Sequence, residues 1–469
     1  MKQLIFNPVI LLILAAIGIV FFLLGIHLSN KKNINLGLRQ AVIFLFLLTG
    51  FNLTVPPFVY LYPDALTGFD KTIGSAIFQL GIYAFTVFIL RSWFALLPHR
   101  ILLLFKNPFL GLFIIFSTLS CLWSETLDLS LRSGLVFLSV SIVSAHIARD
   151  LTWQALAQLL RRLIFGAAIF SFLLAVFMPS TAFNEKGLQG IFPFPIKLGT
   201  CMALGIALWF SYLLEQQKER WKVIGIMIFL MMPLVLSQSG QGIITCFALV
   251  SLVGLMKVLK QAEKLAPVVI LFYLATSILV GESANTVIPK IFGSLGKDTT
   301  LTGRTDFWPQ LIERLGQHNL LLGYGINGFW QPWRGASNPA TGIFNSSGFV
   351  PPHAHNGFID LALSMGLIGF ILFSVSFLLG LSQAVQYFLT SKTSDSNLPL
   401  ILLVYVIFSN ISETQLVGSN YIWILYVITL IRLNIRKPQS YFSAGETRQS
   451  SYPLIQRSYL TSIQNSDHN

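Results

Sequence analysis

Charged residues are scarce in this chain of 469 residues. Only 10% of them are charged and 54% are hydrophobic, whereas about a quarter of the residues of a soluble globular domain are charged. The apolar runs of about 16 to 21 residues are too long for the alternating strands of a membrane barrel. Because a membrane span must satisfy its own backbone hydrogen bonds, we predict an all-α, polytopic integral membrane protein with about 12 to 13 transmembrane helices.

Cysteine is also rare, and the motifs of several enzyme classes are missing. The three cysteines (Cys121, Cys201 and Cys246) are far apart and lie in or beside apolar runs, so no disulfide framework is expected. The sequence has no P-loop, no His/Cys cluster with zinc spacing, no Asp-x-Asp pair for a divalent metal and no serine nucleophile elbow. These absences argue against ATP hydrolysis, metal-dependent sugar transfer and serine hydrolysis. We expect no cofactor and no metal.

The net charge of +13 is explained by membrane topology. Of the 31 Lys and Arg residues, 21 lie in loops that alternate along the chain or in the C-terminal segment. Lys and Arg accumulate in short cytoplasmic loops, so these loops and the C-terminus are predicted to face the cytoplasm. The charge excess then indicates contact with the lipid bilayer and gives no support for binding nucleic acid.

The same counting assigns a polar, aromatic-rich segment, residues 282–357, to the extracytoplasmic side, before the last three spans. We predict a membrane-embedded domain over residues 1–434 that includes this loop, and a disordered cytoplasmic tail over residues 435–469. Within the loop, residues 306–316 are expected to form a helix, with Asp306 as its N-cap and an apolar face of Phe307, Leu311 and Leu315.

The loop concentrates side chains that suit the transfer of a sugar from a lipid phosphate. Guanidinium groups bind phosphate, aromatic faces stack on sugars and a histidine can take a proton from a hydroxyl. Such arginines and tryptophans are also common as plain interfacial anchors. The candidates in the loop are Arg304, Trp308, Arg314, Arg334, His353, His355 and Asn356.

Several motifs resemble those of the O-antigen ligase and polymerase superfamily. In the loop and at the start of the span that follows it they are Gly303-Arg304-Thr305 with Trp308, Leu322-Gly323-Tyr324-Gly325, His355-Asn356-Gly357-Phe358-Ile359-Asp360 and Gly366-Leu367-Ile368-Gly369. An earlier segment, Leu119 to Ser124 with Arg132, and a late one, Asn410 to Thr414, extend the resemblance over about residues 117–430. The late segment is similar to the branch of the superfamily that acts in exopolysaccharide production.

The resemblance implies a function and roles for individual residues. Members of the superfamily take glycans from undecaprenyl diphosphate on the outer face of the bacterial inner membrane and transfer them to a glycan or lipid acceptor, by an inverting, metal-independent reaction. His355 would help to deprotonate the acceptor hydroxyl, and Arg304 would neutralise the diphosphate. Arg132, Lys197, His353 and Glu413 are further candidates for binding the substrate.

Two points stay open at the level of the sequence. The family carries a basic residue in the turn that here reads Ser237 to Gly242, where Gly240 and Gln241 stand instead. Lys197, Arg314 or Arg334 could replace that cation, or diphosphate binding could differ. A polymerase is favoured over a ligase onto lipid A core. A transporter or flippase of lipid-linked glycans is the alternative from another class, although the chain keeps its charge away from mid-span positions.

Overall fold

The computed structural model describes residues 8–29, 36–51, 81–86, 102–215, 219–260, 268, 269, 273, 304–345, 348–391 and 393–435. Within these ranges the chain is almost entirely helical, and the extended pairing is a short hairpin of β1 (Phe183–Asn184) and β2 (Gly187–Leu188). The predicted all-α class is therefore confirmed. The predicted tail beyond residue 435 and the first part of the polar loop, residues 282–303, lie outside the described residues.

Most of the predicted apolar runs coincide with helices. These are α2 (Pro8–Ser29), α3 (Leu36–Gly50), α7 (Pro108–Leu119), α8 (Leu127–Asp150), α9 (Trp153–Phe177), α11 (Pro195–Glu215), α12 (Arg220–Leu236), α13 (Gly240–Leu259), α16 (Gly357–Thr390), α17 (Leu398–Ile411) and α18 (Tyr421–Leu433). Among the described residues, five helices are long and apolar enough to cross a membrane: α8, α9, α11, α13 and α16. The predicted total of 12 to 13 spans stays a prediction, because residues 52–80 and 274–303 lie outside the description.

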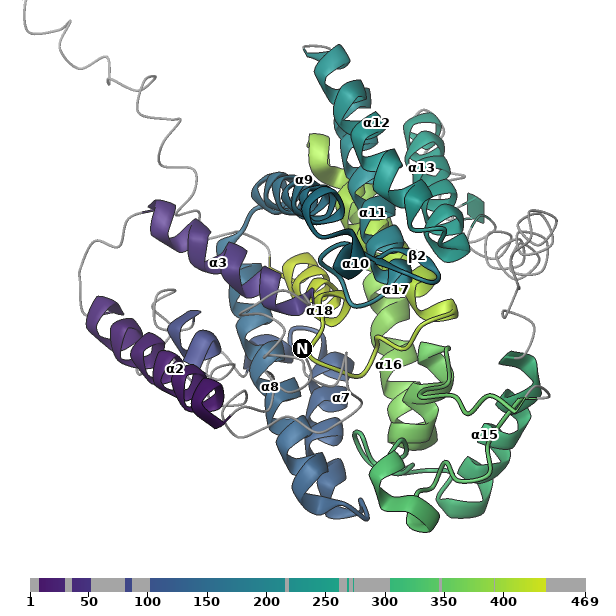
Figure 1. Ribbon diagram of the computed structural model, residues 1–469. Coiled ribbons are helices and arrows are strands. Elements are labelled where there is room, and N and C mark those ends of the chain that lie inside the picture. Colours follow the sequence, from purple (N-terminus) through teal and green to yellow (C-terminus); the bar gives the residue numbers. More distant parts are fainter. Residues whose placement is uncertain are drawn as a thin grey trace, which may run out of the picture.

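The helices form two neighbouring groups (Figure 1). In one, α11 packs against α9, α12 and α13; in the other, α18 packs against α8 and α16 against α7. Trp423 of α18 is fully buried, stacks on Phe137 of α8 with ring centroids 4.5 Å apart, and donates its indole N–H to Ser141 Oγ at 2.9 Å. The polar atom of this large aromatic side chain is thus satisfied inside the core, as is usual for buried tryptophan.

The outer surfaces of the bundle are apolar as well. Phe177 is 77% exposed, Phe247 70% and Phe170 64%, all on helices that are otherwise hydrophobic. A soluble protein rarely leaves such large apolar surfaces in contact with water. The exposed rings are explained by contact with lipid, which supports the multi-pass membrane assignment.

Helix α16 is broken near its start, at Gly366. This glycine has φ of 59°, outside the helical range, and the backbone groups around the break are taken up by the preceding turn. The amides of Leu367 and Ile368 donate to the carbonyls of Leu320 and Leu321 at 2.9 and 3.2 Å. A Cβ on Gly366 would lie 2.2 Å from the carbonyl oxygen of Leu321, so only glycine fits there. The turn and the break therefore lock the polar loop to α16.

The polar loop folds around its own small core at one end of the bundle, beside α16 (Figure 1). Helix α15 (Arg304–His318) carries the predicted apolar face, and Phe307, Leu311 and Leu315 are at most 5% exposed. The predicted start was wrong by two residues: the helix begins at Arg304, so Asp306 lies in its first turn instead of capping it. The helix also runs two residues beyond Gly316, which was expected to end it.

The shorter elements of the chain are η2 (Ser120–Leu122), α10 (Pro179–Ala182), η4 (Pro332–Ser337) and η5 (Ser394–Asn397).

Candidate functional site

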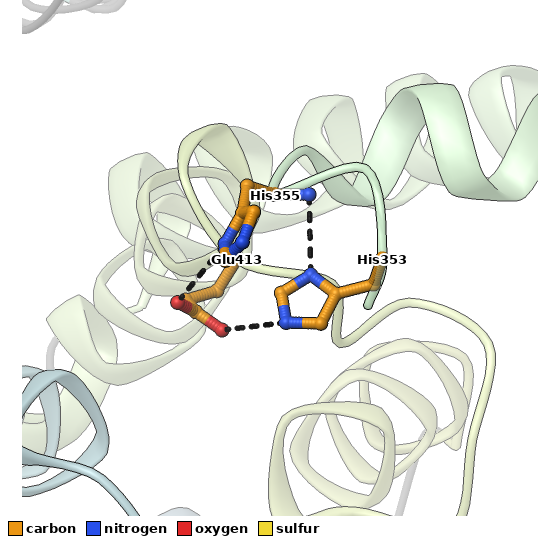
Figure 2. A group of neighbouring side chains, drawn as sticks. All are labelled: His353, His355 and Glu413. Atoms are coloured by element: carbon orange, nitrogen blue, oxygen red, sulfur yellow. Dashed lines mark hydrogen bonds and ion pairs between the residues drawn. The ribbon is translucent and has the colours of Figure 1, made fainter. Parts of the chain in front are cut away.

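Three ionisable side chains from two distant segments meet at the start of α16. His353 and His355 belong to the loop that leads into this helix, and Glu413 follows the end of α17 (Figure 2). Nδ1 of His355 lies 3.8 Å from Oε1 of Glu413, and Nε2 of His353 lies 3.9 Å from Oε2 of the same carboxylate. The two imidazole rings are 4.0 Å apart between centroids. Of the predicted site residues, these three are thus brought together.

The local backbone explains why both imidazoles point the same way. Asn356 is the N-cap of α16, and its side-chain oxygen accepts from the amides of Phe358 and Ile359 at 2.9 and 3.2 Å. His355, just before the cap, has φ of 50°, a left-handed conformation that is uncommon for residues other than glycine. Its amide donates to Nδ1 of His353 at 3.1 Å. The turn therefore folds the two side chains onto one side.

This hydrogen bond fixes the protonation of His353. A ring nitrogen that accepts a hydrogen bond carries no proton, so Nδ1 of His353 is bare and its proton is on Nε2, which faces Glu413. Glu413 likewise favours a proton on Nδ1 of His355, the nitrogen that it faces. Nε2 of His355 is then left with a free lone pair, as a general base requires.

Glu413 is a buried carboxylate, only 8% exposed, and it is held in the charged form. Burial by itself would raise its pKa, but interactions with His355, His353 and Lys197 outweigh that effect and lower the pKa from 4.5 to about 2. At neutral pH, Glu413 therefore presents a full negative charge to both imidazoles, much as the carboxylate of a catalytic triad orients its histidine.

The same three residues also have the composition of a metal site. Their potential ligand atoms all lie within 4.8 Å of one another, and two histidines with one carboxylate bind several divalent transition metals. A metal on Nε2 of His353 would, however, displace the proton that the hydrogen bond to Nδ1 requires there. The observed hydrogen bonding therefore fits acid–base chemistry better than metal binding.

Lys197, in the first turn of α11, is the cation whose charge reaches Glu413. Its side chain is partly buried, and no described residue forms a hydrogen bond or an ion pair with its ammonium group. The ring of Phe194 lies 6.0 Å from Nζ. A sheltered ammonium without a partner is costly to bury unless an anion completes its environment. It is therefore well suited to an anionic substrate group.

Two of the other predicted cations are engaged elsewhere in the protein. Arg314 donates to the carbonyl of Thr341 at 2.9 Å, and Arg334 forms an ion pair with Glu125 at 2.9 Å. Arg132 lies in the second turn of α8. The side chain of Arg304, at the start of α15, lies outside the description. A direct role of these four in binding substrate stays a prediction.

The turn without the expected basic residue packs against the start of α11. A Cβ on Gly199, two residues after Lys197, would lie 2.8 Å from the side chain of Ser239. Ser239 caps α13, and Gln241 donates its side-chain amide to the carbonyl of Phe408. Neither Gly240 nor Gln241 offers a cation, but Lys197, two residues before Gly199, places a basic residue at this end of α11.

Two further residues hold the histidine turn. Trp308, predicted as a substrate contact, donates its indole N–H to the carbonyl of Ala354 at 2.9 Å. Asp360 was recognised only as part of a motif, but its buried side chain accepts from the amide of Ala354 at 2.9 Å. The spacing of Asp360, four residues after Asn356 and thus one helical turn further on, was the signal that could have revealed it.

Comparisons with known proteins match a stretch of the sequence that contains the histidine turn. Residues 199–374 match the Wzy_C family, described as O-antigen ligase, and this range contains both histidines. The chain is also 28% identical over 274 residues to the exopolysaccharide production protein ExoQ of Rhizobium meliloti (strain 1021). That match covers 56% of this chain and 62% of the relative, so the chain spans less than two thirds of the relative's length. Together with the motifs around His355 and Gly366, these matches show that the central part of the chain is similar to the O-antigen ligase and polymerase superfamily.

Proposed function

We propose that this protein is a membrane glycosyltransferase that moves an oligosaccharide from undecaprenyl diphosphate to a sugar hydroxyl, on the outer face of the bacterial inner membrane. The observation that carries the proposal is the pairing of His355 with the charged Glu413, beside the unpartnered ammonium of Lys197. A base and a cation at one place are the two groups that such a transfer needs.

The reaction is a single displacement. Nε2 of His355 takes the proton of the acceptor hydroxyl while the acceptor oxygen attacks the anomeric carbon. The bond from that carbon to the diphosphate oxygen breaks, and the lipid diphosphate leaves as an anion. Attack opposite the leaving group inverts the anomeric configuration. Lys197 and Arg304 stabilise the departing charge, an effect often worth about 3 kcal/mol for each well-placed group. No metal is needed.

The distribution of charge along α11 supports the outer location. Lys197 is in its first turn and Glu215 is its last residue, at the other end of the helix. The charge of Glu215 interacts with Arg161 of α9 and with Lys260 at the end of α13, two cations that the charge count assigns to the cytoplasmic side. The histidine site at the opposite end is then extracytoplasmic, and the C-terminus cytoplasmic.

Exopolysaccharide assembly is the favoured context. The relative from Rhizobium meliloti is described as an exopolysaccharide production protein, and Glu413 belongs to the late segment that resembles that branch. We therefore favour a polymerase that extends a lipid-linked repeat. Transfer to lipid A core, as in a ligase, is the second candidate within the class.

The test uses the full-length protein in lipid nanodiscs with an undecaprenyl-diphosphate-linked oligosaccharide as donor and acceptor. The wild type should lengthen the glycan with EDTA present, and His355→Ala should lose about 10²–10⁴-fold in rate, the usual contribution of a general base. His318→Ala is the matched control, because this histidine is exposed and stacks on Tyr324 at the end of α15.

The outcomes separate the alternatives. Wild-type rates from His355→Ala would overturn the site assignment. Loss of activity in EDTA that is restored by a divalent metal would favour the metal site instead. In sealed proteoliposomes, movement of lipid-linked glycan across the bilayer without any new glycosidic bond would show a flippase and not a glycosyltransferase. With lipid A core added as a second acceptor, a product on lipid A core alone would identify a ligase.

A further inference from the structure

A second buried carboxyl group, that of Asp360, lies behind the histidine turn. Asp360 is 4% exposed and sits in the first turn of α16, where its amide donates to the carbonyl of Asn356 at 3.1 Å. Its side chain binds the histidine turn and the segment that follows α17. The role of Asp360 therefore depends on the groups that donate hydrogen bonds to its two carboxylate oxygens.

These oxygens collect three donors from three separate segments. Oδ1 accepts from the indole N–H of Trp330 at 2.6 Å. Oδ2 accepts from the amide of Ala354 at 2.9 Å and from the hydroxyl of Thr414. Ala354 lies between the two histidines, and Thr414 directly follows Glu413. Oδ2 of Asp360 thus links the turn that carries His355 to the segment that carries Glu413.

The peptide groups around Ala354 are held from both directions. The amide of Ala354 is bound by Asp360 and its carbonyl by the indole of Trp308, and the residue is fully buried. Little freedom is left for the turn that carries His353 and His355. By contrast, Nδ1 of His355 lies 3.8 Å from Oε1 of Glu413, beyond hydrogen-bond distance, and it has no hydrogen-bond partner among the described residues. Their separation is consequently set by the backbone and not by their own contact.

We propose that Asp360 is a positioning residue: through Ala354 and Thr414 it fixes the distance between His355 and Glu413. This inference rests on the proposed function, since it assigns a role for the same pair. Asparagine cannot replace the aspartate, because its single oxygen would leave an N–H of Ala354 or of Trp330 facing another N–H. Displacing a catalytic group by about 1 Å can cost about 10²-fold in rate.

The experiment measures kcat and the KM for the lipid-linked donor in nanodiscs, together with the melting temperature. Asp360→Asn should lower kcat by about 10²-fold while the donor KM stays within about twofold, because the diphosphate contacts are untouched. Thr414→Val should lower kcat by about tenfold, and Thr414→Ser, which keeps the hydroxyl, should restore it. Asp128→Asn is the matched control, an exposed aspartate in the first turn of α8.

Thr414→Val keeps the proposal testable even if Asp360→Asn does not fold. Equal loss of activity in Thr414→Ser and Thr414→Val would overturn it, because the hydroxyl would not matter. A rise in KM or a fall in melting temperature that accounts for the whole loss would show a merely structural role and would also overturn it. If His355→Ala keeps full activity, the proposed function fails; if only the Asp360 and Thr414 variants keep it, this inference alone fails.

Discussion

Ionisable side chains gather at both ends of α11, about 27 Å apart, because 18 helical steps of about 1.5 Å lead from Lys197 to Glu215. At the far end, two cations and two anions from α9, α11, α13 and η5 interact: Arg161, Glu215, Lys260 and Asp395. At the near end, Glu413 faces two imidazoles, and the ammonium of Lys197 forms no hydrogen bond or ion pair with a described residue.

The two clusters also differ in how they are held. The guanidinium of Arg161 lies over the rings of Tyr212 and Trp209, at 4.6 and 5.6 Å from their centroids, and Lys260 lies over Phe388. These residues sit on helices or at a helix end. At the near end, the two histidines and Glu413 sit on loops, with left-handed backbone at His355 and in the adjacent Ser237–Gly242 turn at Gln238. Charged groups held by aromatic rings on helices are typical of a scaffold, whereas strained loops beside a cation without a hydrogen-bond partner are typical of a binding site.

The largest expected effect comes from removing the charge of Glu413. In Glu413→Gln the volume is kept, but the negative charge that orients His355 is lost. In serine proteases the corresponding change costs about 10⁴-fold because the histidine adopts the wrong tautomer. The contact here is longer, so we expect kcat to fall about 10²- to 10³-fold. The measurement is the initial rate of glycan transfer at saturating donor.

Glu313→Gln is the control, since Glu313 is exposed on α15 and bonded only to Gln317. It should retain the wild-type rate. An unchanged kcat in Glu413→Gln would remove the distinction between the two ends. Glu413 would then contribute no more to the rate of transfer than the charged residues around Arg161.

Acid should destabilise the near end more than the far end. The folded-state pKa of Glu413 is lowered from 4.5 to about 2. A lowered carboxyl pKa contributes stability that is complete above about pH 4.5 and is lost as the pH falls through about 2. At about 1.4 kcal/mol for each pKa unit, the contribution is about 3 kcal/mol. Thermal unfolding in detergent between pH 5 and pH 2 should therefore drop more steeply for the wild type than for Glu413→Gln.

Glu313→Gln should follow the wild-type curve in the same titration. Parallel curves for the wild type and Glu413→Gln would mean that Glu413 has an ordinary acidity. The charge pairing inferred for the near end would then have to be abandoned.

Lys197 should contribute to binding of the donor and not to deprotonation of the acceptor. Lys197→Ala removes the cation beside Glu413, and we expect the donor KM to rise about tenfold, an effect of about 1.4 kcal/mol. Lys197→Arg should retain most of the affinity, because a guanidinium also binds phosphate. Inhibition of the wild type by inorganic pyrophosphate should weaken in parallel in Lys197→Ala.

Lys186→Ala is the matched control, as Lys186 is exposed on the nearby β1–β2 hairpin. A donor KM that does not change in Lys197→Ala would mean that Lys197 does not bind the donor. Arg304, Arg314 and Arg334 would then be the remaining candidates for the cation that the Ser237–Gly242 turn lacks.

The near end illustrates what the sequence could and could not predict. The helices follow from long apolar runs, and the buried face of α15 follows from the spacing of Phe307, Leu311 and Leu315. His355 was found through a motif. The meeting of His355 with Glu413 was not predictable from local pattern, because 58 residues and two helices separate them. The break at Gly366 was also missed, since its causes are contacts with the turn at Leu320 and Leu321.

The smallest expected effect lies at the far end. Arg161→Met keeps the apolar stem of the side chain and removes its charge, together with the contacts to Tyr212 and Trp209. Cation–π contacts of this kind are worth about 1 kcal/mol, and the loss should appear as a lower melting temperature. The rate of glycan transfer and the donor KM should stay within about twofold of the wild type. If Arg161→Met reduced transfer as strongly as Lys197→Ala, the charged cluster at the far end would take part in the function, and the distinction between a site and its scaffold would fail.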